Sequence, residues 1–304
     1  MKNTNSSSLL HFTKKMSTLK SIISNGIRFS FSAESFPAKM VKYEMCGNIP
    51  INIRDNKEIC KVGIPMICFC DIPILRAQTH AKKYGNYVIG LDKEYIRDLY
   101  SPILNPVIYC NSENLINMIS RLYFMKNKVL KDDLINLNTA ENRKNLDKYG
   151  AKKFLESKSQ ETETIASFNA DIGFLTGLFK YYNNPEKTDE IYYDEREWRA
   201  FWSNKLSDKT NWIWNMDNLS KKDIKIYNQE IEKSDSGYIK LNSQEIDLAI
   251  THIIVNKEKE TEQMIQHIMS SKKIFGCNTT KMSEIEKLML IRKITSFERI
   301  NRDY

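Results

Sequence analysis

Residues 192–201 mix aromatic and charged side chains, and this mixture strongly limits how the chain can fold. Their Tyr, Trp and Phe residues favour the pleated, half-buried surface of a β-strand, so we predict a strand despite the charges. Side chains alternate between the two faces of a strand, which places Glu195, Glu197 and Arg199 on one face. Burying two carboxylates and a guanidinium is costly unless they pair or hold a ligand. The alternatives are an edge strand with solvated charges, which protects sheets against aggregation, or a Glu–Arg pair that ties the sheet together.

The composition predicts a folded chain, and the order of the predicted strands and helices given below makes it one α+β domain over residues 1–304. Hydrophobic residues make up 41% of the chain and aromatic residues 11%, which is enough for a sizeable core. No apolar run approaches membrane-spanning length, and the polar first residues carry no secretory segment. We therefore expect a cytoplasmic protein without a membrane association.

The six cysteines predict no metal site. They are scattered without a CxxC pair, and Cys68 and Cys70 fall on one face of an apolar strand as neutral thiols. Asp71, Glu195 and Glu197 could converge on a cation, but Asp71 is better explained as a helix cap. The chain also lacks the HExxH, P-loop, GxSxG and GxGxxG motifs.

The net charge of +8 and the pI near 9.0 permit a polyanionic partner. The basic residues are interleaved with acidic ones and form no patch spaced by aromatic residues. The abundance of Lys, Ile and Asn together is also what an AT-rich genome produces. The charge therefore allows nucleic-acid binding without indicating it.

Alternating and continuous apolar runs predict the strands, and 3.6-residue periodicity predicts the helices. Beyond residues 192–201, the predicted strands are residues 9–13, 27–32, 64–70, 87–91, 106–110, 237–241 and 248–255. A first helix begins at a Ser17 cap and ends before Gly26, and a second begins at an Asp71 cap. Residues 33–62 are expected to be irregular. Residues 112–182 are expected to form a helical insertion, and a late charged helix contains residues 264–269.

His11 and Thr13 share one face of the first predicted strand. They form a candidate pair for hydrogen bonds to a ribose or an amide at the end of that strand. The alternative for His11 is a core histidine bonded to the backbone.

Two short motifs resemble the ADP-ribosyltransferase fold. His-Phe-Thr at 11–13 followed by LKSIISNGI at 19–27 is similar to its opening strand and helix, and Glu-Arg-Glu at 195–197 is similar to its late Glu-x-Glu strand. Over roughly residues 8–270, the chain is more specifically similar to the AbiGi family of abortive phage-resistance proteins. The segments that carry this similarity are IPMICFCDIP at 64–73, YGNY at 84–87, NPV at 105–107 and YDEREWR at 193–199.

The resemblance implies an ADP-ribosyltransferase-like split β-sheet core, with NAD as the substrate. Breaking the nicotinamide–ribose bond creates positive charge on the ribose, which a carboxylate stabilises. By resemblance Glu197 has this role, and Glu195 orients or activates the acceptor.

The resemblance also implies residues that hold NAD. His11 and Thr13 would hold the adenosine ribose or the nicotinamide end, and Arg28 is a candidate for the pyrophosphate. The middle motif of the fold is absent, and residues 68–70 take its place, with Phe69 as a stacking surface.

These expectations favour a phage-defence effector that transfers ADP-ribose to a host or phage macromolecule, with nucleic acid slightly preferred over protein. One alternative is a non-enzymatic defence protein that binds nucleic acid or a partner protein through the same cleft. Another is an NAD glycohydrolase. The resemblance alone implies a cognate partner protein. The enzymatic hypothesis requires His11 and Glu197 to lie on the same side of the sheet.

Overall fold

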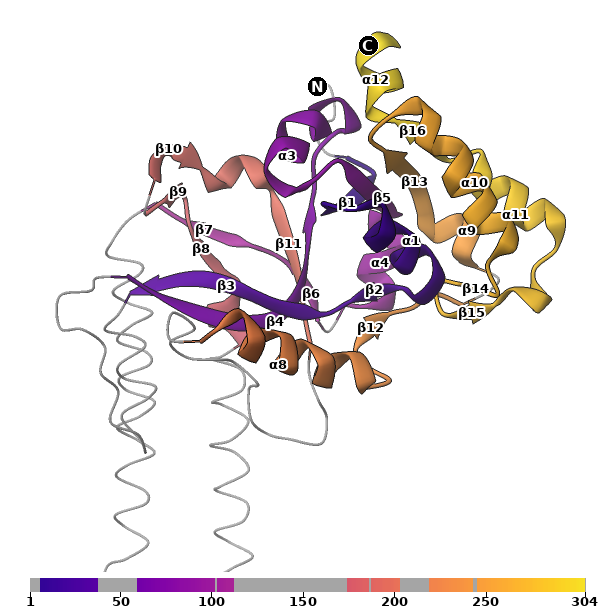
Figure 1. The fold of residues 1–304 in the computed structure, drawn as a ribbon. Coiled ribbons are helices and arrows are strands. Elements are labelled where there is room, and N and C mark those ends of the chain that lie inside the picture. The colour runs from indigo at the N-terminus through magenta and orange to yellow at the C-terminus, as the bar shows by residue number, and fades with distance from the viewer. Residues whose placement is uncertain are drawn as a thin grey trace, which may run out of the picture.

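An eight-stranded sheet forms the centre of the computed structural model (Figure 1). The structure describes residues 6–37, 59–101, 103–111, 174–185, 187–202, 219–242 and 245–303. The strand order is β16-β13-β5-β1-β4-β11-β6, and β3 also pairs with β4. The bounds are β1 Ser8–Thr13, β3 Ser30–Pro37, β4 Ile59–Cys70, β5 Tyr87–Asp92, β6 Leu104–Pro106, β11 Glu197–Phe201, β13 Ile250–Val255 and β16 Ile294–Ser296. The predicted α+β class is confirmed, whereas the ADP-ribosyltransferase-like core stays a prediction.

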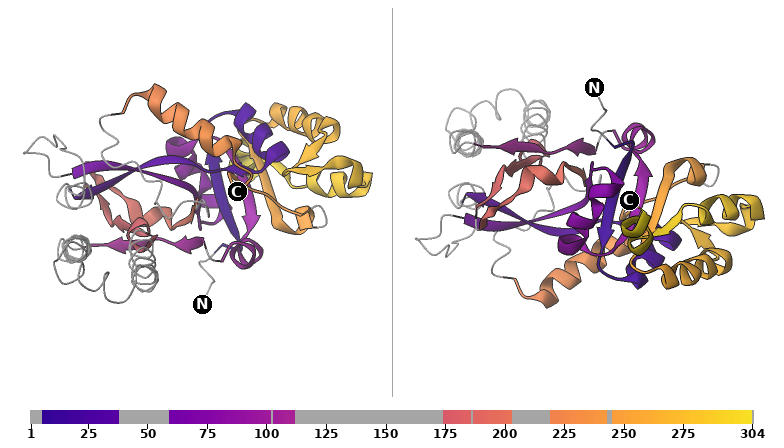
Figure 2. Two further views of the ribbon diagram at one scale, coloured as in Figure 1. Left: turned by 90° about the horizontal axis from the view of Figure 1, so that it is seen from below. Right: turned by 90° about the horizontal axis from the view of Figure 1, so that it is seen from above.

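The sheet divides along one edge of β4. Met66 of β4 pairs with β3 on one edge and with β11 on the other, and Cys70 pairs with β1 and with β11. Strands β1 and β3 therefore lie on the same edge of β4, one at its carboxyl end and the other along its first eight residues. Between them a short length of this edge is left without a neighbouring strand. The β3–β4 ribbon extends away from the rest of the sheet (Figures 1 and 2).

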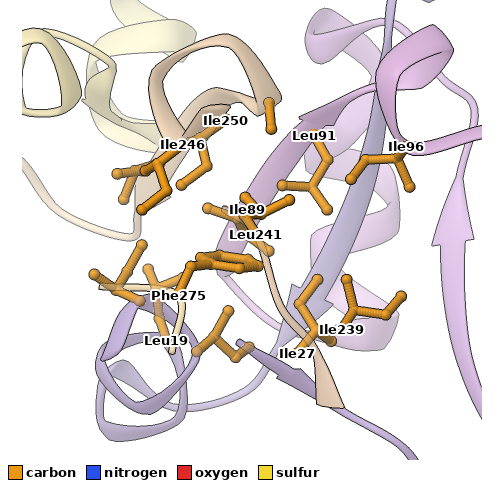
Figure 3. Packing of buried hydrophobic residues seen from close by; sticks show 14 of the residues in the cluster. Leu19, Ile27, Ile89, Leu91, Ile96, Ile239, Leu241, Ile246, Ile250 and Phe275 are labelled. Carbon is orange, nitrogen blue, oxygen red and sulfur yellow. The ribbon is translucent and has the colours of Figure 1, made fainter. Parts of the chain in front are cut away.

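Helices cover both faces of the other half of the sheet. On one face, α1 (Met16–Asn25) and α10 (Thr261–Ser270) pack over a large apolar cluster that contains Leu19, Ile89 and Phe275 (Figure 3). On the other face, α3 (Ala77–Tyr84) and α12 (Phe297–Asp303) pack against a smaller cluster. Successive side chains along one strand point into the two clusters in turn, because side chains of a strand alternate between the two faces of the sheet.

The remaining elements surround this sheet. Helix α8 (Lys221–Lys233) packs against β3, where Asn228 accepts a hydrogen bond from the backbone of Phe31 at 2.9 Å. The α9 (Ile246–Ala249) and α11 (Glu284–Ile291) helices gather with α10 beyond β13, at the end away from the β3–β4 ribbon (Figures 1 and 2). The smaller elements are α4 Lys93–Leu99, β2 Ile27–Arg28, β7 Ile108–Cys110, β8 Phe179–Tyr181, β9 Asn183–Asn184, β10 Lys187–Ile191, β12 Tyr238–Ile239, β14 Lys273–Ile274 and β15 Cys277–Asn278. None of the described helices is long and apolar enough to span a membrane.

The two predicted helix caps are wrong. Helix α1 begins one residue before Ser17, with Lys15 in the cap position and no side-chain cap. Its predicted end is confirmed, because Gly26 adopts a φ of 94° that favours glycine. Asp71 caps no helix, since the extended Pro73 precedes a 3-10 turn and α3 starts only at Ala77. Asp71 instead forms an ion pair with Lys93 at 2.9 Å.

The prediction that residues 33–62 are irregular is partly wrong. Strand β3 continues to Pro37 and β4 begins at Ile59, although β4 contains Gly63 and Pro65. Eight consecutive residue pairs join the two strands, and this pairing outweighs the low strand propensity of Gly and Pro. The predicted strand 248–255 also starts two residues too early, because α9 continues to Ala249.

The predicted strand 192–201 and the predicted insertion 112–182 both need correction. Tyr192–Glu195 form the 3-10 turn η2, Arg196 has a φ of 43°, and β11 begins only at Glu197. Residues 112–173 lie outside the described residues. The end of the predicted insertion is wrong, because β8 pairs in parallel with β7 and so belongs to a small sheet. This pairing outweighs the helical periodicity of the preceding residues.

Candidate functional site

A cavity of about 310 Å³ lies where the sheet divides. Its walls come from β1, β3, β4, α3, β8, η2 and β11, so segments far apart in the sequence meet there. Six charged residues line it: Glu34, Lys61, Lys83, Lys180, Glu195 and Glu197. Acids and bases are present in equal number, so the cavity is strongly polar but balanced in charge.

Glu197 and Arg199 form a buried pair on one face of β11. The alternation of side chains along the strand brings them together, as predicted. Arg199 is fully buried, and its Nε donates to the carboxylate of Glu197 at 2.8 Å. Its other nitrogens donate to Glu34 on β3 and to the carbonyl of Gly177, both at 2.6 Å. The guanidinium therefore joins β11 to the β3–β4 ribbon.

Lys180 lies between the two carboxylates of the predicted motif. Its Nζ is 2.7 Å from Glu195 Oε2 and 2.7 Å from Glu197 Oε2. The same Nζ lies 4.4 Å from the centre of the Tyr192 ring, which is within range of a cation–π contact. Lys180 comes from β8, outside the central sheet.

Glu195 reaches the network from the turn η2 and not from the strand. The left-handed Arg196 separates it from Glu197, so strand alternation does not orient it. Its Oε1 accepts hydrogen bonds from Lys83 at 2.7 Å and from the Tyr84 hydroxyl. The prediction that Glu195 shares a strand face with Glu197 and Arg199 is therefore wrong, and Glu195 meets Glu197 through Lys180 instead.

The network keeps its charges in spite of burial. Burial alone would raise the pKa of Glu197, but Arg199 and Lys180 outweigh it and hold the pKa well below its ordinary value. Burial likewise opposes the ammonium of Lys180, but the carboxylates of Glu197, Glu34 and Glu195 raise its pKa well above the usual range. At neutral pH the cavity therefore presents the ionised carboxylate of Glu197 beside the protonated Lys180.

His11 bonds to the backbone, which is one of the two alternatives expected for it, and its role in holding a ribose or an amide stays a prediction. Its Nδ1 donates to the carbonyl of Cys68 at 2.9 Å, across the gap between β1 and β3 on the edge of β4. Burial lowers its pKa, so the ring is neutral, and with Nδ1 protonated its Nε2 is the acceptor nitrogen. His11 also lines the cavity together with Glu197. Thr13 is buried and does not line it.

The side chains of Arg28 and Phe69 lie away from the Glu195 and Glu197 carboxylates. Arg28 forms an exposed ion pair with Glu232 at 2.6 Å and lines a neighbouring cavity of about 450 Å³. The two cavities have His11, Ser32 and Cys68 in common. Phe69 is fully buried in the core and touches His11 edge to face at a centroid distance of 5.8 Å. Its ring therefore supports His11 and offers no face to the cavity.

Cys68 and Cys70 share one face of β4, as predicted, and line the cavity from there. Burial raises the pKa of both thiols, and the Glu197 carboxylate adds to this effect, so both stay protonated. Among the described residues, no group of three or more His, Cys, Asp or Glu side chains could hold a metal ion.

Sequence analysis missed four residues of the network, namely Glu34, Lys83, Tyr84 and Lys180. Lys83 lies at the end of the second predicted helix, and Tyr84 is the first residue of the YGNY segment at 84–87. This segment was the only sequence signal for these two residues, and it was weak. Glu34 fell in a segment predicted to be irregular, and Lys180 in one predicted to be helical. Their convergence depends on strand pairing that local periodicity does not reveal.

The fold and the site define an α+β protein with a charged cavity beside a divided sheet. The chain belongs to the AbiGi family: the family model described as "Putative abortive phage resistance protein AbiGi, antitoxin" matches residues 38–252. The predicted family membership is therefore confirmed. No curated protein and no solved structure matches the chain.

Proposed function

We propose that this chain acts in abortive phage resistance by binding NAD in the cavity and transferring ADP-ribose to a macromolecule. The observation that carries the proposal is that His11 and Glu197, nearly two hundred residues apart in the sequence, line one cavity. The strands present the two side chains from opposite faces, because Leu10 and Glu197 both pair with Cys70 and His11 follows Leu10. The enzymatic hypothesis therefore depends on the open gap beside β4, where both side chains reach the same cavity. The AbiGi description supports the defence role.

The two neighbouring cavities suit a dinucleotide. Ligand sites commonly enclose about 300–1,000 Å³, and the first cavity alone is at the lower end of this range. The nicotinamide ribose would lie beside His11 and Glu197, and the pyrophosphate would extend into the second cavity. Arg28 lines that second cavity, where a phosphate would compete with Glu232 for its guanidinium.

The proposed reaction exchanges one bond at the ribose C1′. The bond to the nicotinamide nitrogen breaks, and its electron pair leaves with neutral nicotinamide. A nucleophile of the acceptor forms the new bond to C1′ and loses its proton to Glu195. The low pKa of Glu197 keeps its carboxylate ionised, so that it stabilises the positive charge that develops on the ribose.

A second candidate function is an antitoxin that performs no chemistry. Two observations favour it: the family description names an antitoxin, and both carboxylates already have partners within the protein. In this case the network is structural, and the ligand is a cognate toxin protein bound elsewhere on the surface. The two functions predict opposite results for one substitution.

The test compares wild-type protein with Glu197→Gln in a bacterial host, following growth, cellular NAD and labelled ADP-ribose. We expect the wild type to arrest growth and transfer label, and Glu197→Gln to do neither. A fall in NAD without retained label would indicate a glycohydrolase. Growth arrest by the variant equal to that by the wild type would show that the Glu197 carboxylate is structural and overturn the transferase. Rescue of a cognate toxin by both proteins, without growth arrest by either alone, would support the antitoxin.

Glu258→Gln is the matched control. Glu258 is also paired with an arginine, Arg299, but lies far from the cavity residues in the C-terminal part of the fold. We expect this variant to behave like wild type, because it removes a glutamate–arginine ion pair, here a partly exposed one, without touching the cavity.

A further inference from the structure

We propose that the Lys180 ammonium occupies the position of a cationic ligand group. A positively charged ring then binds there by displacing this ammonium from Glu195 and Glu197. The inference rests on the proposed function in one respect, namely that NAD carries such a ring in its oxidised form. It makes Lys180 a residue that determines specificity by charge. It assigns the cavity to flat cationic rings and not to anions.

The surroundings of the ammonium are those that recognise an organic cation. Glu195 and Glu197 each place an oxygen 2.7 Å from Nζ, and the Tyr192 ring faces it at 4.4 Å. Two carboxylates and an aromatic face together bind quaternary and ring cations in proteins. In this structure a side chain of the protein itself occupies that position.

The two carboxylates keep other partners when Lys180 leaves. Glu197 retains Arg199 at 2.8 Å, and Glu195 retains Lys83 at 2.7 Å and the Tyr84 hydroxyl. Displacement therefore removes one partner from each carboxylate and leaves neither isolated. An uncompensated buried charge, which would oppose the exchange, does not arise.

The exchange of Lys180 for a ligand cation requires well-held carboxylates and a movable ammonium, and the elements that carry these groups differ in this way. Glu197 lies in the central sheet, held between β4 and β6. Lys180 lies on β8, a three-residue strand that pairs with β7 in a small separate sheet. The Glu197 carboxylate is thus fixed in the sheet and Glu195 lies in the turn just before it, while the competing cation is on a short peripheral strand with a long, flexible side chain.

The test measures binding by calorimetry for wild type, Lys180→Met and Lys180→Arg. The probes are two pairs that differ in ring charge: oxidised NAD against NADH, and 1-methylnicotinamide against nicotinamide. We expect Lys180→Met to bind the cationic member of each pair about tenfold more tightly than wild type, with little change for the neutral member. We expect Lys180→Arg to bind the cations more weakly, because a guanidinium bridges two carboxylates more firmly.

The opposite order would overturn the proposal. If Lys180 contacts the ligand directly, Lys180→Met weakens binding of all four probes and Lys180→Arg largely restores it. An equal change for the charged and neutral probes would also overturn it, because a purely structural role does not depend on ring charge. Lys180→Arg keeps the positive charge, so it decides the question even where Lys180→Met fails to fold.

The small probes separate this proposal from the transferase function. A gain by Lys180→Met for 1-methylnicotinamide, with no binding of NAD to any of the three proteins, would support the role of Lys180 and overturn NAD as substrate. Binding of NAD and label transfer by the wild type, with affinities independent of residue 180, would do the reverse.

Discussion

The two halves of the central sheet are stabilised by different interactions. Strands β13, β5 and β1 are covered on both faces by apolar clusters and helices. Strands β4 and β11 carry, on the face beside the cavity, a network of buried ions centred on Arg199, which is fully buried. Apolar burial contributes about 25 cal/mol per Å² to stability, whereas a buried ion pair is often no better than an apolar replacement. The charged half is therefore expensive for a structural role alone, which suggests that it serves function.

The largest effect should come from removing the cation that joins the charged half together. Arg199→Met leaves Glu34 and Glu197 without their shared guanidinium, and we expect a loss of about 3–5 kcal/mol in the free energy of unfolding. The measurement is chemical denaturation at neutral pH. Leu91→Ala in the apolar half is the matched comparison, with an expected loss of about 2–5 kcal/mol.

A second substitution that compensates for the loss of Arg199 distinguishes the charged half of the sheet from the apolar half. Arg199→Met combined with Glu34→Met should recover much of the lost stability, because one uncompensated charge is removed and Glu197 keeps Lys180. No second polar-to-apolar change can repair Leu91→Ala, whose cost is a cavity. A double variant as unstable as Arg199→Met alone would mean that the ion pairs stabilise the fold and that the comparison is wrong.

The next effect is a dependence of the free energy of unfolding on low pH, which we expect from the charged half only. The pKa of Glu197 in the folded protein is below its ordinary value of 4.5, so its ionised form stabilises the fold above that pH. This stabilisation is lost as the pH falls below about 4.5 towards the lower folded value. We expect the stability difference between wild type and Glu197→Gln to be largest at pH 7 and to shrink at pH 3. A constant difference between pH 7 and pH 3 would show that the Glu197 carboxylate is not held by its cations.

Sequence analysis was successful for the apolar half and limited for the charged half. The period of two in β1 and β5 and the 3.6 period in α1 and α10 follow from local burial, so these elements were predicted closely. On β11 the same alternation correctly joined Glu197 with Arg199. The predicted first strand, together with the resemblance to the ADP-ribosyltransferase fold, identified His11, which lines the same cavity.

The remainder of the site depends on contacts between distant segments. Glu34 enters the network only because β3 continues past the predicted strand 27–32 and β4 begins before the predicted strand 64–70, so that the two pair. Lys180 enters it because β8 pairs with β7 after a helical pattern. Neither pairing leaves a periodic signal in one sequence, because it depends on which strands meet in space.

The smallest effect should come from Arg196, whose left-handed backbone lies between the two glutamates. Its φ of 43° lies in the left-handed region, which costs an L-residue about 1–2 kcal/mol and glycine much less. We expect Arg196→Gly to change the free energy of unfolding by no more than about 1 kcal/mol and to keep the affinity for the cationic probes. Arg196→Val should be less stable than Arg196→Gly and bind those probes more weakly, because a β-branched residue resists this conformation and would turn Glu195 away from Lys180. Equal stability and affinity of the two variants would mean that the strand β11 alone, and not the turn before it, sets the position of Glu195.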